Sequence, residues 1–342
     1  MELCVIEGDG VGHEVIPAAV EVLKTLFPNL KIHRAGAGWD YFQAHGFPVS
    51  EATIELARRC GAVLFGAANS PSYPVDGYYS PIVRMRRLLK VHANIRPISY
   101  LPVSTARAGV DLIVVRENTE DVYLSQEKSS NINGEKGTVQ KIVTRAATEK
   151  ISHTAFQLAR LAKRRLVTIV HKGNVLPQTD GLFRRVAFEV AEQYKDIQTD
   201  ELLVDTAAYW MVKEPTRFDI ILTSNQYGDI LSDMAAAWGG GLGFIPALNL
   251  GDDVGIAEPV HGSAPDIAGK GMANPTGAIL SAAMLIRYHW QKPQIAEQVE
   301  AAVRNTIDEG AYTADVKANG AVTTGEFAQL ICQKLQAATA AS

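Results

Sequence analysis

DIILTSNQYGDILSD, residues 219–233, joins an apolar run to a segment with two carboxylates four residues apart. The run Asp219 to Thr223 has the composition of a buried strand, and the residues from Gly228 onward fit a helix. On such a helix Asp229 and Asp233 lie on one face about one turn apart, where they can hold one hard divalent cation. Capping and the helix dipole also favour an acid at a helix start, which accounts for Asp229 better than for Asp233. Both interpretations stay open on this stretch alone.

The alternation of short apolar runs with longer helical patterns extends along the chain. It predicts strands over residues 3–6, 62–66, 110–115, 166–170 and 202–204, and helices over residues 13–27, 50–59, 149–164, 180–194, 276–288 and 295–309. This order is typical of an α/β fold with parallel strands and crossover helices. Prolines in residues 95–102 and glycines in residues 239–243 predict two crossings between domains. Asn133-Gly134 predicts a hairpin within residues 125–144, which we interpret as an oligomerisation arm.

Composition narrows the class of function. The chain has 342 residues, 47% of them hydrophobic and 20% charged, with a net charge of −4. These values fit a globular enzyme and disfavour a nucleic-acid or anionic-membrane partner. The three cysteines, Cys4, Cys60 and Cys332, show neither a disulfide framework nor a CxxC metal motif. With no signal-peptide pattern and no apolar run of membrane-spanning length, we expect a cytoplasmic protein.

The segment EGDGVG, Glu7 to Gly12, follows a predicted strand and opens a helix. It fails the GxGxxG dinucleotide fingerprint because its third glycine would fall at His13. Lys31, His33 and Arg34 occupy the region where a ribose-binding acid is expected. A Rossmann site is therefore disfavoured, and a tight turn with backbone near a ligand remains open.

Three further sets of residues could carry chemistry. Arginines bind carboxylates in a bidentate manner, so a cluster of them would select a di- or tricarboxylate; the basic residues are Arg84, Arg86, Arg87, Lys90, Arg96 and Arg116. For Arg84, Arg87 and Lys90 we favour the interpretation that they are solvated charges on a helix.

Polar residues also lie at predicted strand ends: Tyr123, Lys172, Asn174 and Asp205. Lys172 could act as a base and Tyr123 as a proton donor, although each of the four residues singly fits a structural role. The small residues of Glu258 to Pro275 let backbone approach a planar ligand.

These motifs together closely resemble the β-decarboxylating 2-hydroxyacid dehydrogenases, the isopropylmalate, isocitrate and homoisocitrate dehydrogenase family, from about residue 3 to about residue 333. The resemblance implies a two-domain, isopropylmalate dehydrogenase-like α/β fold with a large mixed sheet that is not a Rossmann fold. Its domains would be residues 1–97 plus 243–342, and 98–242. It further implies a homodimer or higher homo-oligomer with shared active sites, in which Lys172 and Asp205 come from the neighbouring subunit.

The resemblance also implies roles for individual residues. Arg86, Arg96 and Arg116 would clamp the substrate, and Asp205, Asp229 and Asp233 would hold Mg²⁺ or Mn²⁺. Lys172 would take the hydroxyl proton as hydride leaves for the nicotinamide, the β-carboxylate would leave as CO₂, and Tyr123 would help to protonate the enol. Substrate contacts would include Ser80, Val83, Tyr123, Lys172 and Asn174; cofactor contacts would be Asn174, Glu258, His261, Gly262, Ser263, Ala264, Asp266 and Asn274.

Cofactor and substrate can be predicted further. Asp266 would accept hydrogen bonds from ribose hydroxyls and repel a 2′-phosphate, and NADP-using relatives carry Lys-Tyr at Asp266-Ile267, so NAD is expected. Arg116-Glu117-Asn118-Thr119-Glu120 is similar to the isocitrate and homoisocitrate branches, and residues 77–83 resemble fungal-type homoisocitrate dehydrogenases. Val83 disfavours isocitrate, whereas the acid at Asp121 keeps isocitrate open. We expect homoisocitrate first, which would imply lysine-type biosynthesis, then isocitrate, then isopropylmalate. A non-catalytic regulatory subunit is disfavoured because no catalytic or metal residue is lost.

Overall fold

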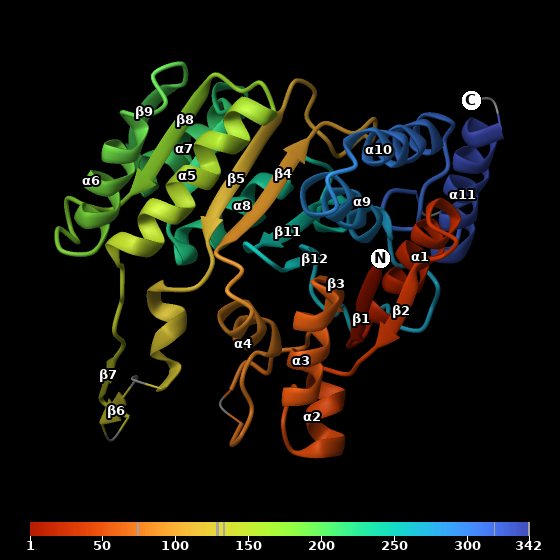
Figure 1. Cartoon of the computed structure of the whole chain (residues 1–342), viewed down its shortest axis with the longest axis horizontal. Helices are drawn as coiled ribbons and strands as arrows, with labels where there is room; N and C mark the ends of the chain where they lie inside the picture. The colour runs from red at the N-terminus through yellow and green to blue at the C-terminus, as the bar shows by residue number, and fades with distance from the viewer. Residues whose placement is uncertain (74, 128–129, 133, 318, 341–342) are drawn as a thin grey trace. The chain divides into compact units, whose positions relative to one another are not determined.

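The structure, a computed structural model, describes all residues except 74, 128–129, 133, 318 and 341–342. The chain forms two compact α/β units (Figure 1). Unit 1 comprises Met1–Leu89, Tyr100–Arg107 and Ala236–Ser342, and unit 2 comprises Lys90–Ser99 and Ala108–Ala235. The chain passes between the units after Leu89, Ser99, Arg107 and Ala235, so none of these crossings coincides with the predicted domain boundaries at 97/98 and 242/243. The division into two functional domains stays a prediction.

The described residues of unit 1 form strands in the order β2-β1-β3-β12-β11. All neighbours are parallel except β11 and β12, which are antiparallel. The strands are β1 (Glu2–Gly8), β2 (Lys31–Arg34), β3 (Ala62–Ala67), β11 (Pro246–Leu250) and β12 (Gly255–Pro259). The helices are α1 (Gly12–Leu26), α2 (Trp39–His45), α3 (Glu51–Cys60), α4 (Pro81–Leu88), α9 (Thr276–Met284), α10 (Pro293–Asp308) and α11 (Thr324–Ala340), with a 3₁₀ turn at Leu242–Phe244 and a π-helical turn at Leu285–His289. Strand β3 is buried along its whole length, as expected of a strand covered on both faces.

In unit 2, the residues that the structure describes form sheet strands in the order β4-β5-β10-β8-β9. In this order β4 and β5 are antiparallel, and the other neighbours are parallel. The strands are β4 (Ala93–Ser99), β5 (Asp111–Glu117), β8 (Leu166–His171), β9 (Gln198–Leu203) and β10 (Ile220–Thr223), and the helices are α5 (Arg145–Leu161), α6 (Asp180–Ala191), α7 (Val204–Lys213) and α8 (Asn225–Ala236), with 3₁₀ segments at Asp121–Glu127 and Pro215–Arg217. Helix α5 packs on β5, β8 and β10 (Figure 1). A separate pair, β6 (Ser130–Ile132) and β7 (Lys136–Thr138), projects from these helices.

The α/β class and the mixed sheet are confirmed. The predicted hairpin is the antiparallel pair β6/β7, with Gly134 in the connecting turn at positive φ and Asn133 outside the described residues. Its role as an oligomerisation arm stays a prediction. The unit assignment changes between Ser99 and Tyr100, within the predicted crossing over residues 95–102, but Pro97 itself lies inside β4, opposite Ile113. A proline removes one donor from the strand ladder and does not by itself end the strand.

Two predicted boundaries near the candidate site are wrong. The strand expected over residues 202–204 is β9, which ends at Leu203, so Asp205 lies in the first turn of α7 and not at a strand end. Val204, the last residue of the predicted strand, is the first residue of α7. Helix α8 begins at Asn225, three residues before the predicted start at Gly228. Among the described residues, no helix is long and apolar enough to cross a membrane.

Candidate active site

The first part of the candidate site lies at one edge of unit 2. Strand β10 pairs in parallel with β5 and places Thr223 beside Arg116, near the carboxyl end of both strands. Helix α8 starts two residues later and carries Asp229 and Asp233. In α/β sheets ligands bind outside this edge of the strands. The topology thus brings a predicted substrate arginine and two predicted metal ligands to the same edge.

Arg116 is the most buried of these charged residues, with 1% of its side chain exposed. Its Nε and Nη2 donate to the Oδ1 of Asn225 at 2.9 and 2.6 Å, and its Nη1 donates to Asp229. Its guanidinium carbon lies 5.3 Å from the ring centre of Tyr123. Gly228 makes this packing possible, because a Cβ there would approach the Cγ of Arg116 to 2.5 Å.

Arg96 reaches the same helix from β4. Its Nη1 donates to the Oγ of Ser232 at 2.7 Å and to the Oδ1 of Asp233 at 3.1 Å, and its Nη2 lies 3.6 Å from Asp229. Its Nε donates to Asn94 at 2.7 Å. The two arginines therefore share one carboxylate, and we call Arg96, Arg116, Asp229 and Asp233 the arginine–aspartate network.

The network has its guanidinium groups inside and its carboxylates outside. The side chains of Asp229 and Asp233 are 42% and 53% exposed, whereas that of Arg96 is 7% exposed. Burial raises the pKa of Asp233, the charge of Asp229 adds to the effect, and Arg96 acts against it. A bound cation would oppose this rise because it favours the ionised carboxylate.

Two partly exposed carboxylates fit the oxygen ligands that Mg²⁺ and Mn²⁺ prefer, with room for substrate oxygens or water. Asp205 does not complete the set within one chain: the described residues bring no group of Asp205, Asp229 and Asp233 together with their oxygens within 4.8 Å. Its contribution from a neighbouring subunit stays a prediction.

Lys172 and Asp205 form a pair of their own in unit 2. Lys172 follows β8, Asp205 opens α7, and the Nζ of Lys172 donates to the Oδ1 of Asp205 at 2.5 Å. This hydrogen bond lowers the pKa of Asp205, whose side chain is 63% exposed. Asn174, two residues after Lys172, is exposed. The structure thus places Lys172 and Asp205 in contact. The resemblance implies that one subunit contributes both residues to its neighbour's active site.

Tyr123 belongs to the arginine–aspartate network through its hydroxyl, which donates to the Oδ2 of Asp229 at 2.9 Å. The loop before it is shaped by Glu117, which accepts from the backbone N and Oγ1 of Thr119 and from the N of Glu120 at 2.6–2.9 Å. Burial raises the pKa of Glu117 to about 7 against these bonds. Glu117 therefore holds the turn that precedes Tyr123, and the hydroxyl of Tyr123 contacts Asp229.

Asp121 in the same loop is a structural residue here. Its side chain is 1% exposed, its Oδ1 accepts from the N of Val122 at 2.8 Å, and its Oδ2 accepts from the N of Gln226 at 3.0 Å. Lys141 lies 3.7 Å from Asp121 and 2.7 Å from Asp180. These internal contacts account for the acid at position 121.

Arg86, the third predicted substrate arginine, lies in unit 1 on α4. Its Nη2 donates to the Oε1 of Glu258 at 2.5 Å, and the two side chains are 8% and 9% exposed. Asn249 donates to the same oxygen at 2.8 Å. Ser80 and Val83 lie at the start of α4 and are half-buried. Glu258, predicted as a cofactor contact, thus holds Arg86 in place.

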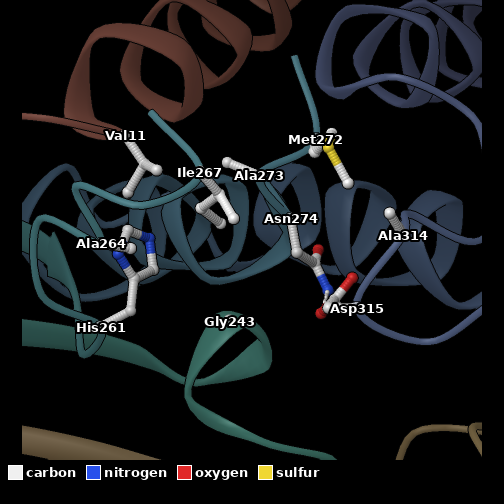
Figure 2. Close-up of a pocket in the computed structure, with 10 residues that line it drawn as sticks. All are labelled: Val11, Gly243, His261, Ala264, Ile267, Met272, Ala273, Asn274, Ala314 and Asp315. Carbon is white, nitrogen blue, oxygen red and sulfur yellow. Dashed lines mark hydrogen bonds between the residues drawn. The ribbon is translucent and has the colours of Figure 1, made fainter. Parts of the chain in front are cut away.

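The predicted cofactor loop borders a cavity of about 280 Å³ in unit 1 (Figure 2). Its lining residues are Val11, Gly243, His261, Ala264, Ile267, Met272, Ala273, Asn274, Ala314 and Asp315. Most are small or apolar. Asn274 donates to the Oδ2 of Asp315 at 3.0 Å, and Figure 2 shows these two side chains next to each other. Burial lowers the pKa of His261, and its Nε2 is buried with no hydrogen-bond partner. A flat ring with nitrogen and oxygen groups at its edge fits such a lining.

The Glu7–Gly12 turn supports this loop. Val11 N donates to the O of Ser263 at 2.9 Å, and a Cβ on Gly10, whose φ is +58°, would lie 2.1 Å from that oxygen. Ser263 is buried, while Gly262 and Asp266 are exposed. The turn therefore approaches the loop by its backbone, as a non-Rossmann glycine segment can.

Sequence patterns missed four residues with evident roles: Asn225, Gly228, Asn249 and Asp315. Asn225 and Asn249 act through buried hydrogen bonds to other site residues, which no local pattern records. Asp315 comes from a turn 41 residues after Asn274. Gly228 offered a signal, since an isolated glycine inside a helix often marks a close approach.

The chain matches the model of the isocitrate/isopropylmalate dehydrogenase family over residues 2–331. It is 45% identical to the isocitrate/homoisocitrate dehydrogenase of Thermus thermophilus over 334 residues, 98% of each chain. It is 41% identical to the 3-isopropylmalate/3-methylmalate dehydrogenase of Methanocaldococcus jannaschii, over 98% of this chain and 99% of the relative. The crystal structure of isocitrate dehydrogenase from Methylococcus capsulatus superposes with a TM-score of 0.93 at 38% identity, covering 98% and 99% of the two chains.

Proposed function

The chain belongs to the isocitrate/isopropylmalate dehydrogenase family of β-decarboxylating dehydrogenases, and we propose that it oxidatively decarboxylates a 2-hydroxy tricarboxylic acid with NAD and a divalent metal. Homoisocitrate, converted to 2-oxoadipate, is the proposed substrate. Isocitrate and then isopropylmalate are the alternatives. The relatives carry names from all three branches, so the choice among the acids depends on this chain's own residues.

The arginine–aspartate network is the observation that carries the proposal. Buried guanidinium groups with partly exposed carboxylates give one surface that offers positive charge to substrate carboxylates and oxygen ligands to a cation. A substrate that carries carboxylates and a hydroxyl complements both. A neutral substrate would leave the guanidinium groups without a carboxylate to bind, and a metal ion alone would use only the carboxylates.

The protein groups have distinct roles in this proposal. Bound Mg²⁺ or Mn²⁺ supplies Lewis-acid polarisation of substrate oxygens. Arg96 and Arg116 bind and orient carboxylates, and Lys172 accepts the hydroxyl proton as hydride leaves for NAD. Tyr123 delivers a proton after CO₂ has left, and its hydrogen bond to Asp229 holds the hydroxyl in place. Lys172 and Asp205 act from the neighbouring subunit of a homodimer or larger assembly.

The cavity beside the Glu258–Asn274 loop is proposed to hold the adenosine part of NAD. Its apolar lining suits the purine ring, and the unpartnered His261 Nε2 offers one hydrogen-bonding atom inside it. Asp266 is exposed and can accept from ribose hydroxyls. We expect NAD to be preferred over NADP, and an Asp266→Ala variant to narrow that preference. A wild-type preference for NADP would contradict the assignment.

Homoisocitrate is favoured by two features. Val83 is neutral and half-buried near the start of α4, which suits an alkyl segment better than a third nearby carboxylate. Asp121, the feature that kept isocitrate open, makes side-chain contacts inside unit 2, which supports a structural role for this acid in place of a role in substrate choice.

The proposal is tested by kcat/KM for the three acids with NAD and Mg²⁺. We expect homoisocitrate to give the highest value; a higher value for isocitrate or isopropylmalate would reject the substrate assignment while keeping the reaction class. Activity should vanish in EDTA and return with Mg²⁺ or Mn²⁺. Loss of turnover in Lys172→Ala, with unchanged urea unfolding, would separate catalysis from folding.

A further inference from the structure

A second cluster of metal-ligating side chains lies in unit 1, and the reaction proposed above does not use it. It consists of Glu2 on β1, His33 on β2 and Cys60 at the end of α3. One ligand atom from each lies within 4.8 Å of the others, and among the described residues this is the one group of three or more that meets that limit. The Nε2 of His33 is 3.0 Å from the Oε2 of Glu2.

The fold brings the three side chains together from distant positions. Strands β1 and β2 are parallel neighbours, with Glu2 opposite Lys31 and Cys4 opposite His33, so Glu2 and His33 point to the same face of the sheet. Helix α3 packs on β1 and ends at Cys60, where Gly61 in the left-handed region turns the chain into β3. The thiol is therefore held above the edge of the sheet by a defined helix end.

The ligand types differ from those of the arginine–aspartate network. Imidazole and thiolate are ligands of Zn²⁺ and related soft or borderline ions, and a carboxylate can complete three protein ligands of a tetrahedral site. Around such an ion the ligand atoms would be about 3.5 Å apart, which requires only small side-chain movements from the present arrangement. The side chains of Glu2 and His33 are 39% and 33% exposed, so the fourth position is open to water.

We propose that Glu2, His33 and Cys60 form a binding site for a Zn²⁺-class ion, separate from the catalytic metal site. The ion would clip the edge strand β2 to β1 and to the end of α3. Binding would replace the thiol proton of Cys60 by the ion, because thiolate is the form that binds a metal.

Cobalt distinguishes this site from an all-oxygen site, because only a thiolate gives a sulfur-to-cobalt charge-transfer band. The reduced, metal-free full chain is titrated with Co²⁺, and Zn²⁺ is then added. We expect one equivalent of Co²⁺ to produce the band, one equivalent of Zn²⁺ to remove it, and Zn²⁺ to raise the thermal midpoint. Absence of the band at saturating Co²⁺ would overturn the proposal.

Matched variants locate the ligands. Cys60→Ser should abolish the band and weaken Zn²⁺ binding at least tenfold, while Cys332→Ser, which changes another free cysteine, should leave both unchanged. His33→Gln should weaken Zn²⁺ binding without touching a thiol, so the proposal stays testable if Cys60→Ser folds poorly. Asp229→Asn should keep the band. Persistence of the band in Cys60→Ser, or its loss in Cys332→Ser, would refute the site.

Discussion

The predicted substrate arginines occur in two arginine–carboxylate arrangements that differ in which partner faces solvent. In unit 2, Arg96 and Arg116 are buried while their partners Asp229 and Asp233 are about half exposed. In unit 1, Arg86 and Glu258 are both buried, and Asn249 satisfies the same carboxylate oxygen. The first arrangement is open to a cation or substrate, and the second is closed on itself.

This difference separates binding groups from positioning groups. An exposed carboxylate can bind a metal ion while it keeps its arginine contact, because part of its surface stays open to solvent. The side chain of Glu258 is 9% exposed, so a metal ion could reach it only by breaking its buried pair with Arg86. We therefore assign Asp229 and Asp233 to ligand binding and Glu258 to the positioning of Arg86, and the following variants test that assignment.

The largest effect is expected for Arg116→Lys. A lysine cannot make the two bonds to Asn225 and the bond to Asp229 together, so buried polar groups lose partners. We expect the free energy of unfolding to fall by about 3 kcal/mol and kcat/KM to fall by about 100-fold or more. Urea unfolding and steady-state kinetics measure the two.

Arg58→Lys is the control for that change, because Arg58 is 45% exposed and pairs with the exposed Glu55 on its own helix. Its unfolding free energy should stay within about 0.5 kcal/mol of the wild type. An Arg116→Lys protein as active and stable as this control would show that the buried guanidinium is not needed for the open arrangement.

The closed pair is tested by Glu258→Gln. The variant removes the charge opposite buried Arg86 but keeps an oxygen that can accept a hydrogen bond, so we expect a loss of about 2 kcal/mol in unfolding free energy. Replacing both residues, as Arg86→Met with Glu258→Gln, should cost less than the sum of the single changes because no buried charge is then unpaired. Additive losses would mean that the pair does not act as a unit.

The sequence predicted far more of this site's residues than of its geometry. Asp229 and Asp233 could be placed on one helix face because the α-helical period is local. The contact between Arg86 and Glu258 could not be predicted, because the two residues are 172 positions apart and β12 itself was not predicted. The Glu2, His33 and Cys60 cluster was hidden for the same reason: β2 is four residues long, and its pairing with β1 is not encoded in any one segment.

Gly228→Ala tests whether the open arrangement depends on close packing. The added Cβ would lie 2.5 Å from the Cγ of Arg116, so the arginine must move away from Asn225 and Asp229. Overpacking should outweigh the helix-forming advantage of alanine and leave a net loss of about 1 kcal/mol. We expect kcat/KM to fall about tenfold. Gly325→Ala in α11, where no atom lies within 4 Å of the new Cβ, should lower neither stability nor activity.

The smallest expected effect concerns Glu117, a buried carboxylate held by the neutral donors of Thr119 and Glu120. Its pKa in the folded protein is about 7, above the ordinary 4.5, so the folded state binds the proton more tightly. The resulting stabilisation is fully present below pH 4.5 and is lost as the pH rises through 7. Between pH 6 and pH 8 the unfolding free energy should therefore fall by about 1 kcal/mol more in the wild type than in Glu117→Gln.

Glu326 provides the matched comparison for that slope. It also accepts from the backbone N and hydroxyl of a threonine, Thr323, but it does so at the surface, and these bonds lower its pKa. Glu326→Gln should leave the difference between pH 6 and pH 8 unchanged, because this carboxyl is ionised in both states throughout that range. Urea unfolding at both pH values measures the slopes. The wild type and Glu117→Gln could instead show the same change in unfolding free energy between pH 6 and pH 8. That result would mean that the three hydrogen bonds outweigh burial and keep Glu117 ionised in the folded protein.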